Sequence, residues 1–202
     1  MKRFKFNQKI GEKPNIDLTV RRVEPEVWDK LQFSKYHYLT SSLNKSCKCL
    51  LFEWGDTPVA FVGILNTPRK GMPYGCSISR IVILPSFNGF GLFRRIVDFV
   101  GGIVKSQSDD EHDYQLYIKT AHTLAGKSLE RNERWSPTSY NGKARKVDGC
   151  EQGKYNNRLT RLSYCYKYVG DKIEGYDELL KPIGELRKSK VSSEPMQLSF
   201  EF

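Results

Sequence analysis

A β-branched run that passes directly into a glycine turn and an amphipathic helix restricts the fold of this chain more than any other feature. Residues 77–84 (Ser-Ile-Ser-Arg-Ile-Val-Ile-Leu) are too apolar for an edge strand and predict a central one. After Pro85 and the turn 86–92, the apolar residues recur at three and four positions, the spacing of a helix with one buried stripe. Those residues are Leu92, Ile96, Phe99, Val100 and Ile103.

The rest of the chain alternates strand and helix patterns. A turn at Gly55-Asp56 between two apolar runs indicates a β-hairpin. Strand-helix alternation within a mostly β chain predicts an α/β fold with a mixed sheet. The predicted strands are residues 16–22, 47–54, 58–65, 77–84, 114–120 and 162–169, and the predicted helices are residues 24–31, 92–103 and 124–133.

Length and charge limit the possible partners and compartments. The 202 residues suit one domain, which we place at residues 1–186, followed by a flexible tail at 187–202. The net charge of +10 favours a polyanionic partner, although a solvated basic surface is the simpler explanation. No apolar run is long enough to cross a bilayer and no signal peptide is evident, so we expect no membrane partner and a cytoplasmic location. Five cysteines without zinc-type spacing predict reduced thiols and no metal site.

The turn at residues 86–92 has the properties of a phosphate site. Gly89 and Gly91 permit positive φ angles and allow the backbone to approach a ligand closely. The following helix offers unpaired N–H groups and the positive end of its dipole, which suits a pyrophosphate. The alternative is that the two glycines only make a tight connection between strand and helix.

In its setting, this turn resembles the acyl-coenzyme-A site of the GNAT acyltransferase superfamily, whose motif is [Q/R]-x-x-G-x-[G/A]. Gly89 and Gly91 match that motif, and Ser86 stands in the Gln/Arg position. The resemblance covers about residues 50–135. It implies acetyl-CoA or another acyl-CoA as cofactor, and a mostly antiparallel central sheet with splayed central strands and helices on both faces. The cofactor-binding residues that it implies are Val82, Ile83, Ser86, Asn88, Gly89, Phe90, Gly91 and Leu92.

The same resemblance implies how the thioester is activated. In that superfamily a backbone N–H at the end of the central strand, here near Ile83, stabilises the negative charge that develops on the thioester carbonyl. A tyrosine on the later helix often protonates the departing thiolate. This chain has Ser128, Leu129 and Glu130 there, so the general acid must come from elsewhere or be dispensable.

Three further segments, residues 35–39, 79–82 and 135–140, are similar to the Mom-type DNA-modification proteins of bacteriophage Mu and its relatives. Those GNAT-fold enzymes modify the exocyclic amine of adenine in phage DNA and mask restriction sites, so the similarity implies double-stranded DNA as partner within a bacterial host cell. Such an enzyme must flip a base, clamp it and hold the flanking phosphates, and Tyr36, His37 and Tyr38 could supply the clamp. The predicted nucleic-acid-binding residues are Tyr36 and, on a basic arm at about 136–161, Lys143, Arg145, Lys146, Lys154 and Arg158.

Four residues are candidates for catalysis. His37 has an ordinary pKa near neutrality, roughly 6.5, and could accept the amine proton, but a histidine between tyrosines is more often structural. Tyr38 and Tyr140 are candidate acids towards the thiolate. Arg80 is placed by the strand pattern on one face with Ile78, Val82 and Leu84. It either contacts cofactor or base, or forms an ion pair with Glu53 or Asp56.

The chain's end adds one further expectation. The segment from Gln197 to Phe202 (Gln-Leu-Ser-Phe-Glu-Phe) resembles peptides with which bacterial DNA enzymes bind the sliding clamp; alternatively, the tail folds back on the domain. Two other functions stay open. One is an N-acetyltransferase for a protein or small-molecule amine, and the other is a non-catalytic module that binds DNA or the clamp.

Overall fold

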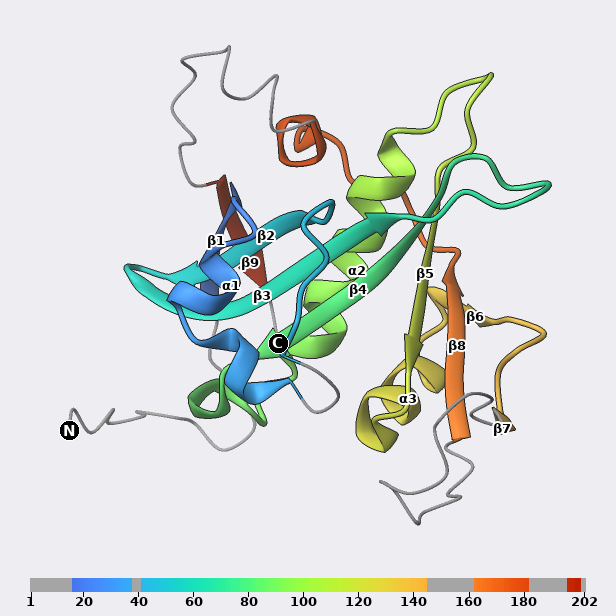
Figure 1. The fold of residues 1–202 in the computed structure, drawn as a ribbon. Helices are drawn as coiled ribbons and strands as arrows, with labels where there is room; N and C mark the ends of the chain where they lie inside the picture. The colour runs from blue at the N-terminus through green and yellow to red at the C-terminus, as the bar shows by residue number, and fades with distance from the viewer. Residues whose placement is uncertain (1–15, 38–40, 145–161, 182–195, 201–202) are drawn as a thin grey trace, which may run out of the picture.

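The computed structural model describes residues 16–37, 41–144, 162–181 and 196–200, which form one mixed sheet with helices packed against it (Figure 1). Its strands are β1 (Ile16–Val23), β2 (Lys48–Trp54), β3 (Thr57–Asn66), β4 (Gly75–Ile83), β5 (Gln115–Thr120), β6 (Trp135–Pro137), β7 (Lys143–Ala144), β8 (Leu162–Tyr168) and β9 (Met196–Phe200). Its α-helices are α1 (Val27–Lys30), α2 (Leu92–Ser106) and α3 (Thr123–Glu130), and its 3-10 helices are η1 (Phe33–Tyr36), η2 (Pro85–Phe87) and η3 (Asp177–Leu180).

The sheet is antiparallel except at its centre. The strand order is β6-β8-β5-β4-β3-β2-β1-β9, with β7 paired to β8, and only the β4–β5 pair is parallel. Parallel neighbours need a crossover connection, and here α2 supplies it. The predicted α/β class is therefore confirmed, and the run at residues 77–84 lies in the central strand β4.

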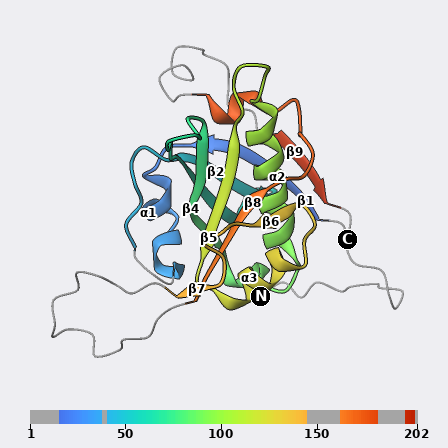
Figure 2. The same cartoon turned by 90° about the vertical axis from the view of Figure 1, so that its right-hand side faces the viewer.

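The sheet buries both of its faces, as Figure 2 shows with α1 on one side and α2 on the other. The larger core joins the sheet to the apolar stripe of α2, including Ile96, Val100 and Ile103. The smaller core gathers Trp28 and Phe33 against Phe61 of β3, with ring centroids 5.1 and 5.5 Å from that phenyl ring. Each such fully buried side chain contributes about 1.5–3 kcal/mol.

The end of the chain differs from the prediction of a flexible tail. Met196–Phe200 forms the edge strand β9, with Leu198 opposite Leu18 of β1 and only 6% exposed. An edge strand presents unpaired N–H and C=O groups, and β9 satisfies those of β1. Among the described helices, none is long and apolar enough to span a bilayer.

Candidate functional site

A β-bulge in β4 decides which side chains face each side of the sheet. Gly63 pairs with Arg80, but Ile64 pairs with Ile78, so Ser79 is an extra residue that interrupts the alternation. As a result Ile78 packs in the larger core beside α2, whereas Val82 packs in the smaller core. The prediction of one shared face is therefore wrong for Ile78, which lies on the opposite face from Val82 and Leu84, because strand periodicity contains no sign of the bulge.

Beyond the bulge, β4 and β5 separate. Their parallel pairing runs from Gly75 opposite Gln115 to Ile78 opposite Ile118 and then stops. From there β4 continues to Ile83 paired with β3, while β5 pairs with β8 on its other side. Figure 1 shows the two strands diverging towards the ends that carry η2 and α3. Over residues 79–83, no described strand occupies this edge of β4.

The backbone of Ile83 is directed into that gap. The Leu84 amide donates a hydrogen bond of 2.9 Å to the Val59 carbonyl, on the β3 side. Amide direction alternates along an extended strand, so the Ile83 N–H points to the opposite side, where β5 has turned away. Its side chain packs against the larger core together with that of Ile81.

The turn after β4 presents backbone and little side chain. Gly89 and Gly91 have φ angles of +91° and +69°, values that strongly favour glycine. Gly91 is the N-cap of α2 and no side chain caps this helix end, so its first amides are available to a ligand. Ser86, Asn88, Gly89 and Gly91 are exposed, whereas Leu92 is buried and Val82 faces the other side of the sheet. Leu92 and Val82 can therefore offer a ligand only their backbones.

The Arg80 guanidinium donates hydrogen bonds to two backbone carbonyls. Its Nε donates to the Ser42 carbonyl at 3.0 Å and its Nη1 to the Ser79 carbonyl at 2.8 Å. Glu53, one predicted partner, instead accepts two hydrogen bonds from Arg21, of 2.7 and 3.1 Å. The expected Arg80–Glu53 pair is therefore wrong: Thr19 is the residue opposite Glu53 in the register, and Arg21, two residues further along β1, reaches across to the carboxylate.

The aromatic segment before this loop belongs to the smaller core. The half-buried ring of His37 packs edge-on against Trp28, with centroids 5.9 Å apart, and the Trp28 indole donates to the Ser41 carbonyl at 2.5 Å. Tyr36 is 51% exposed. Tyr38, the candidate acid beside them, lies outside the described residues.

The predicted basic arm begins from a hairpin. β7 and β8 pair antiparallel, with Lys143 opposite Ser163, so residues 145–161 connect two adjacent strands. Tyr140 is 59% exposed, and the Lys143 ammonium lies 5.6 Å from its ring centroid, a cation–π contact. The predicted phosphate contacts Arg145, Lys146, Lys154 and Arg158 lie outside the part of the chain that the structure describes.

A tyrosine does pack against α3, although the helix carries none. The ring of Tyr164, on β8, occupies the space where a Cβ of Gly126 would stand. Tyr164 also pairs with Thr120, the last residue of β5 at the mouth of the gap. No pattern in the sequence of the helix indicates this residue, because the ring comes from the strand β8.

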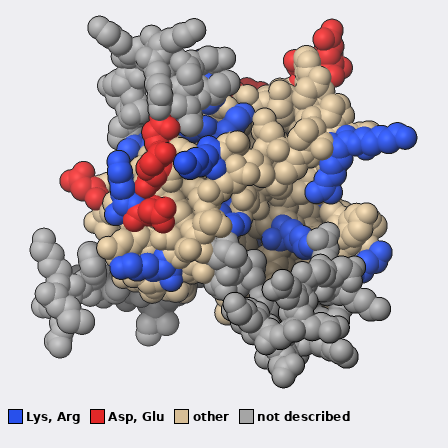
Figure 3. All heavy atoms as spheres, viewed as in Figure 1, with Lys and Arg blue, Asp and Glu red and all other residues tan. Residues whose placement is uncertain are grey.

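One half of the sheet carries basic and polar side chains on the α1 face. Leu116 and Ile118 point into the larger core, so Tyr117 and Lys119 point the other way, and Lys167 lies opposite Tyr117. Burial raises the pKa of Tyr117 despite the nearby charge of Arg69. Figure 3, which views this face, shows a hollow with Lys and Arg side chains in and around it. Sequence reasoning missed these residues because their shared face depends on strand register.

No known protein-family profile matches the sequence, and no curated protein sequence matches it. Solved structures with a similar course of the chain include a GNAT-family acetyltransferase from Streptococcus pneumoniae (15% identity, TM-score 0.49, covering 74% of this chain and 98% of that one). Others are a Bacillus subtilis acetyltransferase in complex with CoA (14%, 0.49, 75% and 97%) and the ribosomal-protein-S18-alanine N-acetyltransferase of Escherichia coli (10%, 0.46, 78% and 96%).

Proposed function

We propose that the chain is an acyltransferase that uses acetyl-CoA or another acyl-CoA as donor. One observation carries the proposal: the gap beside Ile83, towards which a backbone amide points, leads within a few residues to an uncapped helix start with two positive-φ glycines. An amide directed into a gap suits a carbonyl that gains negative charge, and the helix start suits a pyrophosphate. Coenzyme A carries both groups, joined by a flexible arm.

In this proposal each group has a defined task. A bound acyl-CoA would supply an activated thioester. The amide of Ile83 would donate a hydrogen bond to the thioester oxygen as negative charge develops there. Amides at Gly91 and the first turn of α2 would hold the pyrophosphate, with Arg94 and Arg95 adding positive charge. The Tyr164 hydroxyl, on the strand that pairs with the end of β5, would donate a proton to the leaving sulfur.

We further propose DNA as acceptor, with the exocyclic amine of adenine as the nucleophile, in a Mom-like anti-restriction modification. The net charge of +10 and the basic α1 face beside the gap support a polyanionic acceptor. Lys119, Lys167 and Arg80 would lie on the same face as the loop held at Ser42, next to the open edge of β4.

The second candidate is an N-acetyltransferase for an amine of a protein or small molecule. It requires the same donor site, and the packing of His37 against Trp28 favours it, because this ring is engaged in the smaller core rather than free to clamp a base. A non-catalytic DNA-binding module is the third, suggested by the absence of a tyrosine from α3.

Nucleoside mass spectrometry separates these functions. Plasmid DNA would be digested from cells that express the chain or its Gly89→Glu, Gly91→Glu variant. A modified adenosine that appears only with the unaltered chain is the expected result. If only unmodified adenosine is found in both samples, DNA is not the acceptor. If the purified chain still binds coenzyme A in that case, the result supports the second candidate. If the purified chain binds DNA but not coenzyme A, the result supports the non-catalytic DNA-binding module.

Binding of the sliding clamp through Gln197 to Phe202 is a separate proposal. Within this segment the residues from Gln197 to Phe200 belong to β9, paired with β1, so the clamp would have to displace β1. We therefore expect a free peptide of this sequence to bind the clamp more tightly than the whole chain does, measured by fluorescence competition. Equal affinities would mean that β9 does not need to detach.

A further inference from the structure

A pocket of about 310 Å³ lies beside α2, between this helix, the segment after β8 and the edge strand β9. Its apolar wall comes from Phe99 on the helix, from Ile173 and Tyr176 in the segment after β8, and from Leu198 on β9. The Phe99 and Tyr176 rings meet edge to face with centroids 5.0 Å apart. The pocket therefore joins elements from three separate parts of the chain around one aromatic pair.

The polar side of the pocket carries positive charge. Arg95 and Arg134 line it together with Asp98. The Asp98 carboxylate is already satisfied: Oδ1 accepts from Asn132 Nδ2 and Trp135 Nε1, each at 2.7 Å, and Oδ2 lies 3.7 Å from Arg134 Nη1. Two guanidinium groups against one committed carboxylate leave this side net positive, and Arg134 keeps 55% of its side chain exposed to a ligand.

The pocket adjoins the glycine turn through Arg95. This side chain lines the pocket, and its Nη1 lies 3.3 Å from the place where a Cβ of Gly91 would stand. One guanidinium thus reaches both the start of α2 and the pocket. A ligand whose phosphates sit at the start of α2 would meet this cavity with whatever group extends beyond them.

We propose that the pocket holds the phosphorylated purine nucleoside end of the acyl donor, with the purine on the Phe99–Tyr176 side and the ribose phosphate at Arg134. This inference rests on the proposed function. A flat heterocycle suits an aromatic and aliphatic wall, and a phosphate suits guanidinium groups, which bind it with two parallel hydrogen bonds. The size of the pocket is also adequate, since small-ligand pockets begin at roughly 300 Å³.

Calorimetric titration of the purified chain with coenzyme A and with dephospho-coenzyme A, which lacks the ribose phosphate, tests the proposal. The unaltered chain should bind coenzyme A about tenfold or more tightly than the dephospho form, the loss expected for one charge-assisted contact. Arg134→Gln should weaken coenzyme A binding by a similar factor and leave dephospho-coenzyme A binding unchanged. Arg131→Gln, an exposed arginine of the same connection outside the pocket, should change neither.

The possible results separate the inference from the function on which it rests. Equal affinity for the two ligands, or an Arg134→Gln variant that binds coenzyme A normally, would overturn the pocket assignment and leave the acyltransferase proposal standing. No binding of coenzyme A by the unaltered chain would overturn both. Loss of dephospho-coenzyme A binding in Arg134→Gln would also count against the assignment, because the residue would then act through the fold.

Discussion

The carboxylate of Asp98 accepts a hydrogen bond from the indole nitrogen of Trp135 at 2.7 Å, although both side chains are almost fully buried. The same oxygen binds Asn132, so one carboxylate on α2 ties down the connection from α3 to β6. That connection carries Arg134 to the pocket and leads into β6 at the edge of the sheet.

Removal of this carboxylate should destabilise the protein. Asp98→Ala leaves two buried donors without an acceptor and should lower the free energy of unfolding by about 2–4 kcal/mol, measured by urea denaturation. Asp98→Asn retains one acceptor oxygen and should cost less. Asp110→Ala, in an exposed loop, serves as control, and a loss at Asp98 no greater than at Asp110 would contradict the interpretation.

Gly101 tests close packing of α2 against β8. Helix propensity alone predicts that Gly101→Ala gains up to about 1 kcal/mol. The ring of Tyr168, however, already fills the position of an added Cβ, and the ring is buried and cannot swing away. We therefore expect a net loss of about 1–3 kcal/mol in thermal or urea unfolding. Arg94→Ala, exposed on the same helix, should stay within about 0.5 kcal/mol of the unaltered chain.

Tyr164 tests the proposed proton donor. Tyr164→Phe keeps the ring against Gly126 but removes the hydroxyl, so turnover should fall about 10²-fold or more while coenzyme A affinity stays unchanged. Tyr166→Phe on the same strand is the matched control. Unaltered turnover in Tyr164→Phe would assign proton donation to another group.

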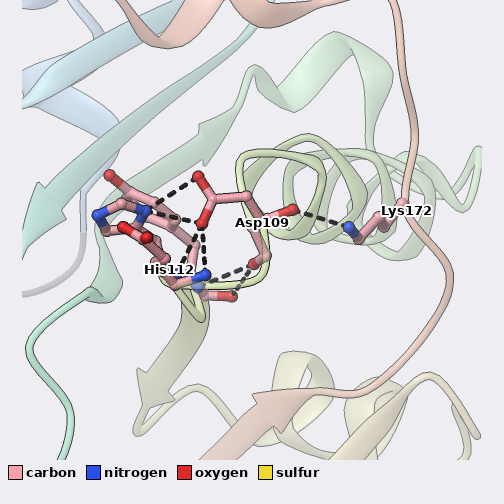
Figure 4. Close-up of polar contacts among 6 residues, drawn as sticks. Asp109, His112 and Lys172 are labelled. Atoms are coloured by element: carbon pink, nitrogen blue, oxygen red, sulfur yellow. Dashed lines mark hydrogen bonds and ion pairs between the residues drawn. The ribbon is translucent and has the colours of Figure 1, made fainter.

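Asp109 tests the electrostatics of the loop between α2 and β5, shown in Figure 4. Hydrogen bonds from the Glu111 amide, and then from the His112 side chain, lower the pKa of the Asp109 carboxyl below its ordinary value. The charged form is thus favoured in the folded state, so this contribution to stability is present above the ordinary carboxyl pKa and is lost as pH falls through the lowered one.

Nuclear magnetic resonance titration measures this directly. The Asp109 carboxyl carbon should titrate at lower pH in the folded chain than in the same chain unfolded in urea. In His112→Gln the midpoint should rise only part of the way, because the Glu111 amide still donates at 2.9 Å. Identical midpoints in the folded and unfolded chain would disprove the lowered pKa.

Local sequence patterns predicted most elements of the fold. The strands that became β1 to β5 and β8, and the helix α2, lie within a few residues of their expected positions. Periodicity, glycine and proline placement act over one or two turns of chain, so they can be read without knowledge of distant partners. The turn at Gly89 and Gly91 is also a local feature of the sequence, and its positive φ angles agree with the prediction.

The sequence by itself therefore determined the succession of central strand, glycine turn and helix, and with it the place proposed for a phosphate. Tertiary structure alone decided what surrounds that place: the bulge at Ser79 that turns Arg80 towards Ser42, the ring of Tyr164 against α3, and the pairing of β9 with β1. Each of these depends on register and contact between segments far apart in the chain. Such contacts are selected by the packing energy of the whole fold, and no local pattern records them.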